Sequence, residues 1–371
     1  MSNSSTVLLF PCIEKNLGDD LFVKLICEKL PNKTFEVSDR AKYGSLTRIN
    51  NLRFSRTLTK YLHYTGRVPR NRIKRAIYFL LGKYYGKRMG RHATGVMIVG
   101  NAFKNYQPFS FNDTKWFTYR MDLVDKFFLI STNFGPYTDE RWRDAFSEYF
   151  SRCEDVCFRD NKSFSLFQTL PNVRVAPDAV FSLGRIQRKS DTKTIIVSVI
   201  DCQTAGRPQW LQEFKKAYEG KLTETIDLLT EKGYKAVLLN SNELQDEAAS
   251  EGILCSVRNK DMVSVFHYDG EIEKVIDLYA TASGVISTRL HTLVLGLLAD
   301  IPVFPIIYDE KVAGILESVH FSGLTVAIKD IREIAPEWIM NSLASYTFRL
   351  SDVFIRNANE QFSGLVKQIG R

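Results

Sequence analysis

Short apolar runs alternate along the first half of the chain with segments whose apolar residues recur every three to four positions. The runs are rich in Val, Ile and Phe and are bounded by turn residues, which is typical of buried strands. We predict strands at 7–10, 95–99, 127–131, 155–158 and 173–175. The longer periodicity predicts helices at 19–30, 139–151 and 162–170.

The second half repeats this alternation after a polar stretch, 185–193, which has no periodicity and which we interpret as a linker. Predicted strands lie at 194–200, 234–239, 284–287 and 303–307. Predicted helices lie at 209–232, 270–282 and 289–299. The first of these helices has a natural C-terminal stop at Gly233.

Strand–helix alternation in both halves predicts an α/β protein with parallel sheets covered by helices. We expect a first domain over residues 1–184 and a second over 194–344, each doubly wound, followed by a C-terminal segment, 345–371. Two such domains facing each other leave a cleft between the carboxyl ends of their strands, where doubly wound folds bind ligands.

Charge is unevenly distributed along the 371 residues. The formal net charge is +8, yet residues 40–112 hold sixteen Lys and Arg and no Asp or Glu. Everything outside this segment is mildly acidic, with 34 basic and 42 acidic residues. With 44% hydrophobic residues, the composition excludes a disordered chain, a collagen-like fibre and a disulfide-stapled miniprotein.

The six cysteines form no CxxC pair and no zinc-type spacing, so we interpret them as reduced thiols of a cytosolic protein and expect no metal site. The first residues lack the basic and apolar regions of a signal peptide. The longest apolar stretch is interrupted by His291, Asp300 and two prolines, which favours a helix followed by a strand over a membrane span. We therefore expect a soluble, cytoplasmic protein.

The strongest candidate site is the segment from Ser287 to Thr292, where a buried strand ends and an apolar helix begins. Free backbone N–H groups at such a helix start bind anions, and Arg289 and Thr292 add donors. His291 is one of only five histidines and is a candidate proton donor in the same corner. The alternative is a structural histidine beside a capping arginine.

A second arginine, Arg159, follows a predicted strand in the first half, and Asp160 or Asn161 can cap the next helix. The alternative is a local Arg–Asp pair with a helix cap. Taken together, Arg159 and Arg289 can hold the carboxylate and phosphate of a small, multiply charged substrate, because a guanidinium binds oxyanions in bidentate fashion.

The turn after the first strand contains Asn16 and the acidic pair Asp19 and Asp20. These carboxylates either satisfy the start of the helix or accept a proton from a sugar hydroxyl. Lys311 lies after another strand end, where an exposed lysine is the commoner explanation. The chain has no dinucleotide fingerprint, no Walker sequence and no nucleophile elbow.

At this point the residues resemble the polysaccharide pyruvyl transferase family over about residues 7 to 315. The resemblance rests on the order and spacing of several short motifs, since no single motif is decisive. They are Asn16-Leu17-Gly18-Asp19-Asp20, Gly135-Pro136, Arg159-Asp160 with Ser163, Pro177-Asp178-Ala179-Val180-Phe181, Arg289-Leu290-His291-Thr292, Pro302-Val303, and Tyr308 with Lys311. The chain departs from the family pattern at Gly100-Asn101, where a glycine-rich turn is usual, and at Asp300, where glycine is common.

The resemblance implies a GT-B-like fold of two Rossmann-like domains, with the C-terminal helix returning to the first domain. It also implies that the pyruvyl group of phosphoenolpyruvate, a co-substrate, becomes a cyclic ketal on two sugar hydroxyls. No further cofactor and no metal is implied. We predict His291 as the acid, Arg289 as an anion clamp and Asp19 as the carboxylate that faces the acceptor. The predicted substrate-binding residues are Arg159, Arg289, Thr292, Asn16, Asp20, Asn101 and Lys311.

The basic segment 40–112 is not part of the family's common pattern. Within it, residues 67–91 hold nine basic side chains around an apolar, aromatic centre, and a basic amphipathic helix near 73–85 can lie on an anionic membrane surface. A lipid-linked sugar acceptor at the inner face of the cell membrane, on a path to exopolysaccharide or capsule, would explain both charge and aromatics. The alternatives are a solvated face on an ordinary core helix and, with no recognised motif, nucleic acid.

Two rival functions remain open from the sequence. One is a GT-B glycosyltransferase that uses a nucleotide sugar. The other is a non-catalytic protein that binds glycans or anions with the same fold. The choice of donor separates the first rival from a pyruvyl transferase, and phosphate release separates the second.

Overall fold

In the computed structural model, the chain forms two compact units. The first unit comprises Met1–Ile13, Asp19–Ser182 and Asn357–Arg371, and the second comprises Glu14–Gly18 and Leu183–Arg356. The structure describes residues 6–13, 15–66, 69, 71–100, 102–105, 107–110, 114–204, 207–242 and 245–370.

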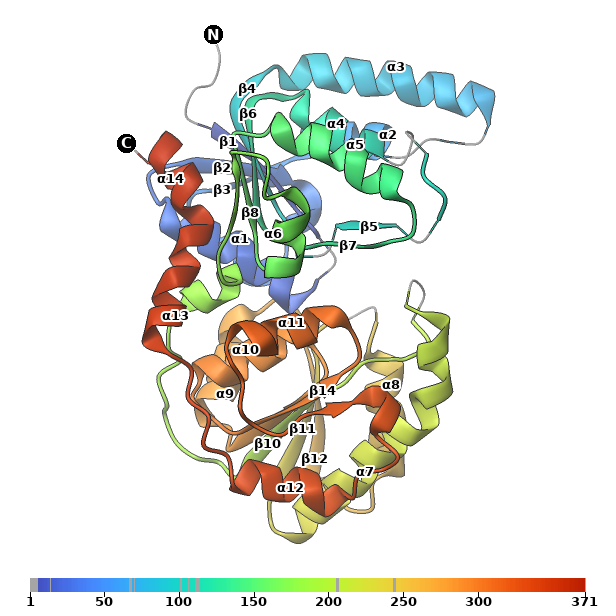
Figure 1. Cartoon of the computed structure of the whole chain (residues 1–371), viewed down its shortest axis with the longest axis vertical. Coiled ribbons are helices and arrows are strands. Elements are labelled where there is room, and N and C mark those ends of the chain that lie inside the picture. The colour runs from blue at the N-terminus through green and yellow to red at the C-terminus, as the bar shows by residue number, and fades with distance from the viewer. Residues whose placement is uncertain are drawn as a thin grey trace. The chain divides into compact units, whose positions relative to one another are not determined.

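A parallel seven-stranded sheet forms the centre of the first unit, in the order β3-β2-β1-β4-β6-β8-β9 (Figure 1). Its strands are β1 (Thr6–Pro11), β2 (Thr34–Ser38), β3 (Leu52–Ser55), β4 (His92–Ile98), β6 (Val124–Thr132), β8 (Asp155–Phe158) and β9 (Val173–Val175). A separate parallel pair consists of β5 (Phe103–Asn105) and β7 (Phe134–Tyr137). Strands β1 and β4, where the order changes direction, pair through Leu8 and Gly95.

Helices cover both faces of this sheet, as expected for parallel strands joined by crossovers. They are α1 (Leu17–Lys29), α2 (Arg56–Thr65), α4 (Lys115–Met121), α5 (Glu140–Ser151), α6 (Asn161–Phe167) and α14 (Ser363–Ile369), with short 3₁₀ turns η1 (Asp39–Ala41), η2 (Gly44–Arg48), η4 (Ala179–Leu183) and η8 (Ala358–Phe362). Helix α3 (Arg72–Met89) packs on α2. One core cluster is strongly aromatic: the ring of Phe103 meets those of Phe146 and Phe150 edge-on, with centroids 5.0 and 5.3 Å away. Such geometry suits the charge distribution of aromatic rings.

The second unit is a parallel six-stranded sheet in the order β12-β11-β10-β13-β14-β15. Its strands are β10 (Thr194–Ser198), β11 (Lys235–Asn240), β12 (Val263–His267), β13 (Gly284–Ser287), β14 (Val303–Ile307) and β15 (Val326–Ala327). Counted within the unit, this is the order 3-2-1-4-5-6 of a dinucleotide-binding fold. The strand order reverses between β10 and β13, so a ligand crevice is expected at their carboxyl ends.

Helices α7, α8 and α12 pack side by side on one face of this sheet, and α9, α10 and α11 pack on the other (Figure 1). Their bounds are α7 (Lys215–Glu231), α8 (Glu247–Ser256), α9 (Ile272–Thr281), α10 (Leu290–Leu298), α11 (Glu310–Ser318) and α12 (Pro336–Ala344), with α13 (Asp352–Asn357) and the 3₁₀ turns η5 (Gln209–Phe214), η6 (Lys260–Met262) and η7 (Ile328–Asp330). Apolar side chains of α10 are buried all round, which is why its sequence shows no polar face.

The predicted α/β fold class is confirmed, and the predicted strands appear within a few residues of their expected bounds. The helix expected over 209–232 is wrong in its first part, because Gln209–Phe214 forms the 3₁₀ turn η5 before α7 begins. The polar stretch 185–193 is irregular as expected, but it belongs to the second unit, where Ile186 N–H donates to the Leu298 carbonyl and Lys189 N–H donates to the Ala280 carbonyl.

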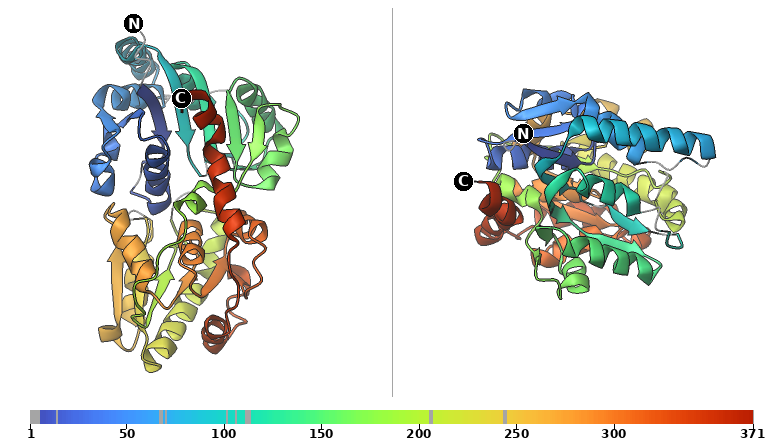
Figure 2. Two further views of the ribbon diagram at one scale, coloured as in Figure 1. Left: turned by 90° about the vertical axis from the view of Figure 1, so that its left-hand side faces the viewer. Right: turned by 90° about the horizontal axis from the view of Figure 1, so that it is seen from above.

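The C-terminal segment joins the first unit from Asn357 onward. The buried Gln361 side chain fastens it there: Nε2 donates to the carbonyls of Phe158 and Ala176, and Oε1 accepts from the backbone N–H of Ser131. These bonds place the segment across β6, β8 and the residue after β9 (Figure 2). This return is the one that the sequence resemblance implies.

The departure at Asp300 has a backbone explanation. Asp300 follows α10 with φ of +54°, a left-handed conformation in which glycine is the least strained residue and Asp is one of the few tolerated alternatives. The same turn therefore forms here with an aspartate.

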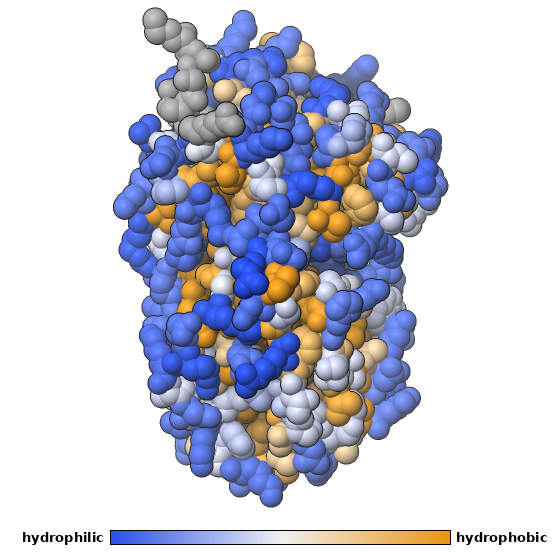
Figure 3. Space-filling view, turned by 60° about the vertical axis from the view of Figure 1, so that its left-hand side comes forward, coloured by the Kyte–Doolittle hydropathy of each residue, from blue (hydrophilic) through white to orange (hydrophobic). Residues whose placement is uncertain are grey.

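Hydrophilic side chains cover most of the face shown in Figure 3, and hydrophobic ones appear there as separate patches. Among the residues that the structure describes, no helix combines the length and the hydropathy that a membrane crossing requires.

Candidate functional site

The carboxyl ends of β10 and β13 meet at a buried cluster of hydroxyl groups. Ser198 and Ser287 are register partners on these strands. The Thr292 Oγ1 lies 2.9 Å from Ser198 Oγ and 2.6 Å from Ser287 Oγ, and it donates to the Arg289 carbonyl at 2.7 Å. Because Thr292 is almost fully buried, its hydroxyl fixes the turn between β13 and α10.

Arg289 precedes α10 and points to a carboxylate from a neighbouring loop. Its Nε donates to Asp246 Oδ2 at 2.8 Å and its Nη2 to Oδ1, while Gln245 Oε1 accepts from Nη2 at 3.3 Å. Asp246 has no exposed surface. Burial alone lowers the pKa of the Arg289 guanidinium, but the adjacent Asp246 carboxylate more than offsets this and the pKa is raised. Arg289 therefore stays charged, and its side chain does not cap α10.

A second guanidinium, Arg207, lies at the same carboxylate. Its Nη2 is 3.5 Å from Asp246 Oδ1, and its guanidinium carbon lies 5.3 Å from the ring centroid of Tyr308. The side chain is only 9% exposed, and its Nε finds no hydrogen-bond partner among the described residues. A buried donor without a partner is costly, so this group is poised to bind an added acceptor.

The cluster of Arg289, Arg207 and Asp246 has an excess of positive charge. The next carboxylate, Asp201, lies 3.4 Å from Lys215, which also pairs with Glu219. Two guanidinium groups around one buried carboxylate are suited to a compact anion such as a phosphate or a carboxylate.

His291 lies one residue into α10 and is half-buried. The segment 15–18 of the second unit lies beside it: a Cβ added to Gly18 would overlap the His291 imidazole. Asn16 holds this segment in place, because its Oδ1 accepts from the Gly18 N–H at 3.0 Å and its backbone bridges to Asn242 after β11. Glycine at this position thus leaves the room that the histidine ring occupies.

Lys311 lies in the first turn of α11, where its Nζ is 2.9 Å from Asp309 Oδ2. The Asp309 side chain also caps this helix by accepting from the Val312 N–H at 3.1 Å. Burial raises the pKa of Asp309, but Lys311 and these hydrogen bonds outweigh it and the pKa is lowered. Lys311 Nζ is 6.0 Å from the Tyr308 ring, on which Arg207 also stacks.

In the first unit, Arg159 follows β8 and is 4% exposed. Its Nη1 donates to Asp178 at 2.8 Å and its Nη2 donates to Asn133 at 2.7 Å. Gly100, after β4, approaches the guanidinium so closely that an added Cβ would lie 2.9 Å from Nη1. The ion pair thus forms with Asp178, 19 residues along the chain, in place of the expected local aspartate, while Asp160 caps α6 through the Ser163 N–H.

The two aspartates in the first turn of α1, Asp19 and Asp20, lie in different environments. Asp20 is buried and accepts from the Tyr43 hydroxyl at 2.6 Å, whereas Asp19 is half-buried. The helix begins at Leu17, and the Asn16 Oδ1 accepts from the Gly18 N–H in its first turn. Asn101, also predicted to bind substrate, lies outside the described residues.

The structure therefore brings Arg289, His291, Thr292 and Asn16 together in the second unit, with Lys311 nearby, and assigns Arg159, Asp19 and Asp20 to the first unit. The sequence reasoning missed two groups in the second unit. Asp246 and Arg207 lie in loops without periodicity, and only their position after strand ends could have drawn attention to them.

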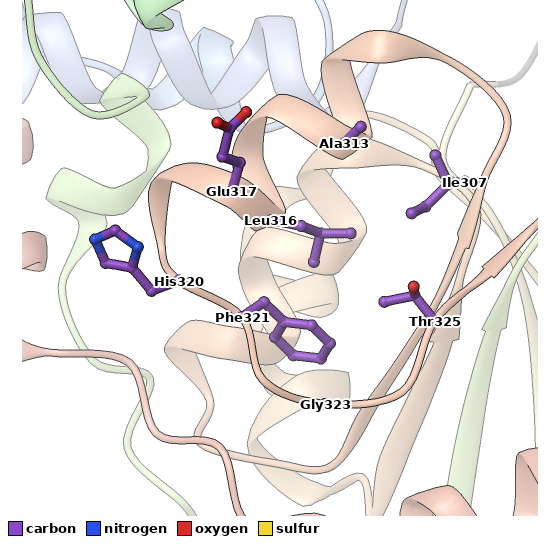
Figure 4. A pocket seen from close by; sticks show the side chains of 8 residues that line it. All are labelled: Ile307, Ala313, Leu316, Glu317, His320, Phe321, Gly323 and Thr325. Atoms are coloured by element: carbon purple, nitrogen blue, oxygen red, sulfur yellow. The ribbon is translucent and has the colours of Figure 1, made fainter.

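A cavity of about 400 Å³ beside α11 has a lining that includes Leu316, His320 and Phe321 (Figure 4). None of the described site residues predicted above is part of that lining. Within the described ranges, no three His, Cys, Asp or Glu side chains form a metal-binding group.

Comparison with known proteins gives a family match and a fold. A family model described as polysaccharide pyruvyl transferase matches residues 16–310. A solved structure described as a UDP-N-acetylglucosamine 2-epimerase from Listeria monocytogenes is similar with a TM-score of 0.56 at 11% identity, over 99% of this chain and 97% of that one. This likeness shows the fold alone and confirms the GT-B-like class.

Two further structures have lower scores. UDP-GlcNAc 2-epimerase from Neisseria meningitidis, bound to UDP-GlcNAc, has a TM-score of 0.48 at 11% identity, over 98% of this chain and 99% of that one. ADP-heptose lps heptosyltransferase II of E. coli has a TM-score of 0.47 at 12% identity, over 93% and 98%.

Proposed function

Because the chain belongs to the polysaccharide pyruvyl transferase family, we propose that it transfers the pyruvyl group of phosphoenolpyruvate to a sugar of a polysaccharide or of its lipid-linked precursor. The product is a cyclic ketal on two sugar hydroxyls, and inorganic phosphate is released. The observation that supports this donor best is the pair of partly buried guanidinium groups, Arg289 and Arg207, around the fully buried Asp246 at the strand-order reversal of the second unit.

The reaction needs an acid, an anion site and an acceptor for hydroxyl protons. Protonation of the methylene carbon of phosphoenolpyruvate leaves a cation at the adjacent carbon, which one sugar hydroxyl attacks. Cleavage of the bond between this carbon and the phosphate oxygen releases phosphate, and the second hydroxyl closes the ketal. Of the two hydroxyl protons lost, one replaces the proton now on carbon and one leaves with phosphate.

In our proposal His291 is the acid, because it is the titratable group at the start of α10 beside the guanidinium pair. Arg289 and Arg207 hold the phosphate or the carboxylate of the donor, and Arg159 of the first unit contacts the donor as well. Asp19 accepts a proton from the acceptor hydroxyl.

The remaining predicted residues have two kinds of role in this proposal. Asn16, Asn101 and Lys311 contact substrate. Thr292 and Asp20 are buried and hydrogen-bonded within their own units, so they position the site and do not touch the substrate.

The acceptor is proposed to be lipid-linked and to be modified at the inner face of the cell membrane, on a path to exopolysaccharide or capsule. No cofactor beyond the co-substrate is needed for the chemistry written above, since every electron pair and proton is supplied by the donor, the two hydroxyls and the named side chains.

The test is to incubate the protein with phosphoenolpyruvate and a panel of nitrophenyl and lipid-linked sugars, and to measure phosphate release and product mass. We expect phosphate release that requires both substrates, and thermal protection by phosphoenolpyruvate but not by nucleotide sugars. Transfer from a nucleotide sugar would instead assign a glycosyltransferase. Anion or glycan binding without turnover on any acceptor would show that the chain is a non-catalytic binding protein.

His291→Ala tests the acid. General acid catalysis is worth about 10²–10⁴-fold, so turnover should fall by that factor while phosphoenolpyruvate still protects the protein. His267→Ala, at an exposed position at the end of the edge strand β12, is the matched control. Near-normal turnover of His291→Ala would remove this residue from the mechanism.

A further inference from the structure

Helix α3 packs on α2 through its glycines. A Cβ at Gly82 would lie 3.1 Å from Thr65 Cγ2, and one at Gly86 would lie 3.1 Å from Tyr61 Cε2. Gly82 is the buried residue of α3, and most of its other side chains are exposed. The two glycines thus mark the narrow face that meets the rest of the first unit.

An apolar stripe lies on the opposite face of α3. Ile73, Ile77, Leu80 and Tyr84 are 72%, 48%, 64% and 53% exposed. Their spacing of four, three and four residues places them on one face of an α-helix. At 100° per residue that face is turned almost directly away from Gly82. A core helix would bury such a stripe, whereas α3 leaves it exposed and buries Gly82 on the opposite face.

Basic side chains flank the stripe on both sides. On the helical wheel, Arg72, Lys83 and Lys87 lie along one margin, and Lys74 and Arg88 lie along the other. No Asp or Glu occurs anywhere between residues 40 and 112, so neither α3 nor the α2 helix on which it packs supplies a neutralising carboxylate from its own sequence.

We propose that α3 docks on an anionic lipid bilayer with its axis in the plane of the surface. Ile73, Ile77, Leu80 and Tyr84 enter the boundary between headgroups and acyl chains, and the flanking Lys and Arg side chains extend to the lipid phosphates. An exposed apolar stripe with basic margins is the pattern of interfacial helices, in which long basic side chains keep their charge at headgroup level. The patch would dock the enzyme at the surface where a lipid-linked acceptor is anchored.

Charge complementarity favours a bilayer over the other occupants. Nucleic acid would use the basic side chains but would not need four exposed aliphatic and aromatic residues in one row. A second copy of the chain would bring the same basic margins together, which costs electrostatic energy. Scattered exposed apolar residues need no partner, whereas a continuous patch marks an interaction surface.

The role in acceptor delivery rests on the proposed function, but bilayer binding by α3 does not, so the two are tested apart. Full-length protein is sedimented with vesicles of phosphatidylcholine alone and of phosphatidylcholine with phosphatidylglycerol, at low and high salt. We expect binding to the anionic vesicles at low salt, little binding to the neutral ones, and weakening by salt.

Two double variants locate the contact. Lys83→Gln with Lys87→Gln should weaken binding about thirtyfold, from the usual attraction per basic residue. Ile77→Ser with Leu80→Ser should weaken it about tenfold or more, from the apolar surface no longer inserted. The controls are Lys216→Gln with Lys232→Gln, which removes two exposed lysines of the second unit, and Val353→Ser, which removes an exposed apolar residue of α13.

All α3 variants should keep the wild-type thermal midpoint, because the changed side chains are exposed, and should keep wild-type transfer to a water-soluble nitrophenyl sugar. Loss of vesicle binding with retained soluble turnover supports the proposal, and failure of turnover in the wild type would concern the proposed function only. No binding to anionic vesicles at low salt, or binding unchanged in both double variants, overturns it. Dimerisation or nucleic-acid binding that the α3 variants abolish, without vesicle binding, also overturns it.

Discussion

Loss of the Asp246 carboxylate should strongly lower the stability of the second unit. It has no exposed surface and accepts from Arg289 Nε at 2.8 Å and, at 3.5 Å, from Arg207 Nη2. The backbone N–H of Asp201 donates to it at 3.3 Å. Asp246→Asn keeps the size of the side chain but removes its charge, and it leaves two partly buried guanidinium groups without this counter-ion.

The size of the effect follows from burial. Removing one partner of a buried ion pair costs about 3–5 kcal/mol of unfolding free energy, because the remaining charge stays buried and uncompensated. The matched control is Asp277→Asn, which removes the partner of Lys189 at 2.7 Å in an exposed pair, with 62% and 61% of the side chains accessible. Exposed pairs contribute about 0–1 kcal/mol, so the control should be nearly neutral.

The assay is hydrogen exchange of the β11 and β13 peptides during urea unfolding, since a chain of two units need not unfold in one step. Inorganic phosphate should stabilise Asp246→Asn more than the wild type, because an anion can replace the lost carboxylate between the two guanidinium groups. Equal stability of Asp246→Asn and Asp277→Asn, with no extra effect of phosphate, would refute the reasoning.

Three further predictions concern other sites. Because the pKa of Asp309 is lowered in the folded state, its stabilising effect is present above the unfolded pKa and is lost as the pH falls through the folded pKa; the difference in urea midpoint between wild type and Asp309→Asn should therefore shrink below about pH 4, and a constant difference would contradict this. Burial raises the pKa of the Cys202 thiol to about 11, so iodoacetamide at neutral pH should label the exposed Cys255 first, as peptide mass spectrometry can show; equal labelling would argue against the buried position. Gly18→Ala should displace the His291 ring and lower turnover at least about tenfold, while phosphoenolpyruvate still protects the protein thermally. An unchanged turnover number would show that Gly18 does not position His291 for the reaction.

The alternation of strands and helices was readable from the sequence because the central strands lie in short buried apolar runs; the edge strands β3 and β12, which contain exposed polar positions, were not predicted. Strand β10, for example, is buried at every position, which produces a continuous apolar run in place of an alternating one. The order of strands in each sheet was not readable, because it depends on pairings such as Ile195 with Gly284, which are distant in sequence.

The candidate site was predictable where a strand runs directly into a helix. Arg289 and His291 occupy such a junction, and the helix α10 that follows is apolar throughout. Asp246 was missed because it meets Arg289 from a loop 43 residues away, and no local pattern encodes that contact. Helix α3 was predicted from its composition, but only its packing on α2 through Gly82 shows which face stays exposed.

The buried Gln361 has a consequence for the order in which the chain can fold as it is synthesised. The first unit contains residues made early, yet β6 and β8 gain the hydrogen bonds of Gln361 only after the 360 residues before it have been made. The second unit is complete at Arg356, before that residue is made. Domains usually finish folding from the N-terminus onward, but here the later unit can close first. A premature stop between Arg356 and Gln361 should therefore leave the second unit folded and the edge of the first unit open to chaperones and proteases.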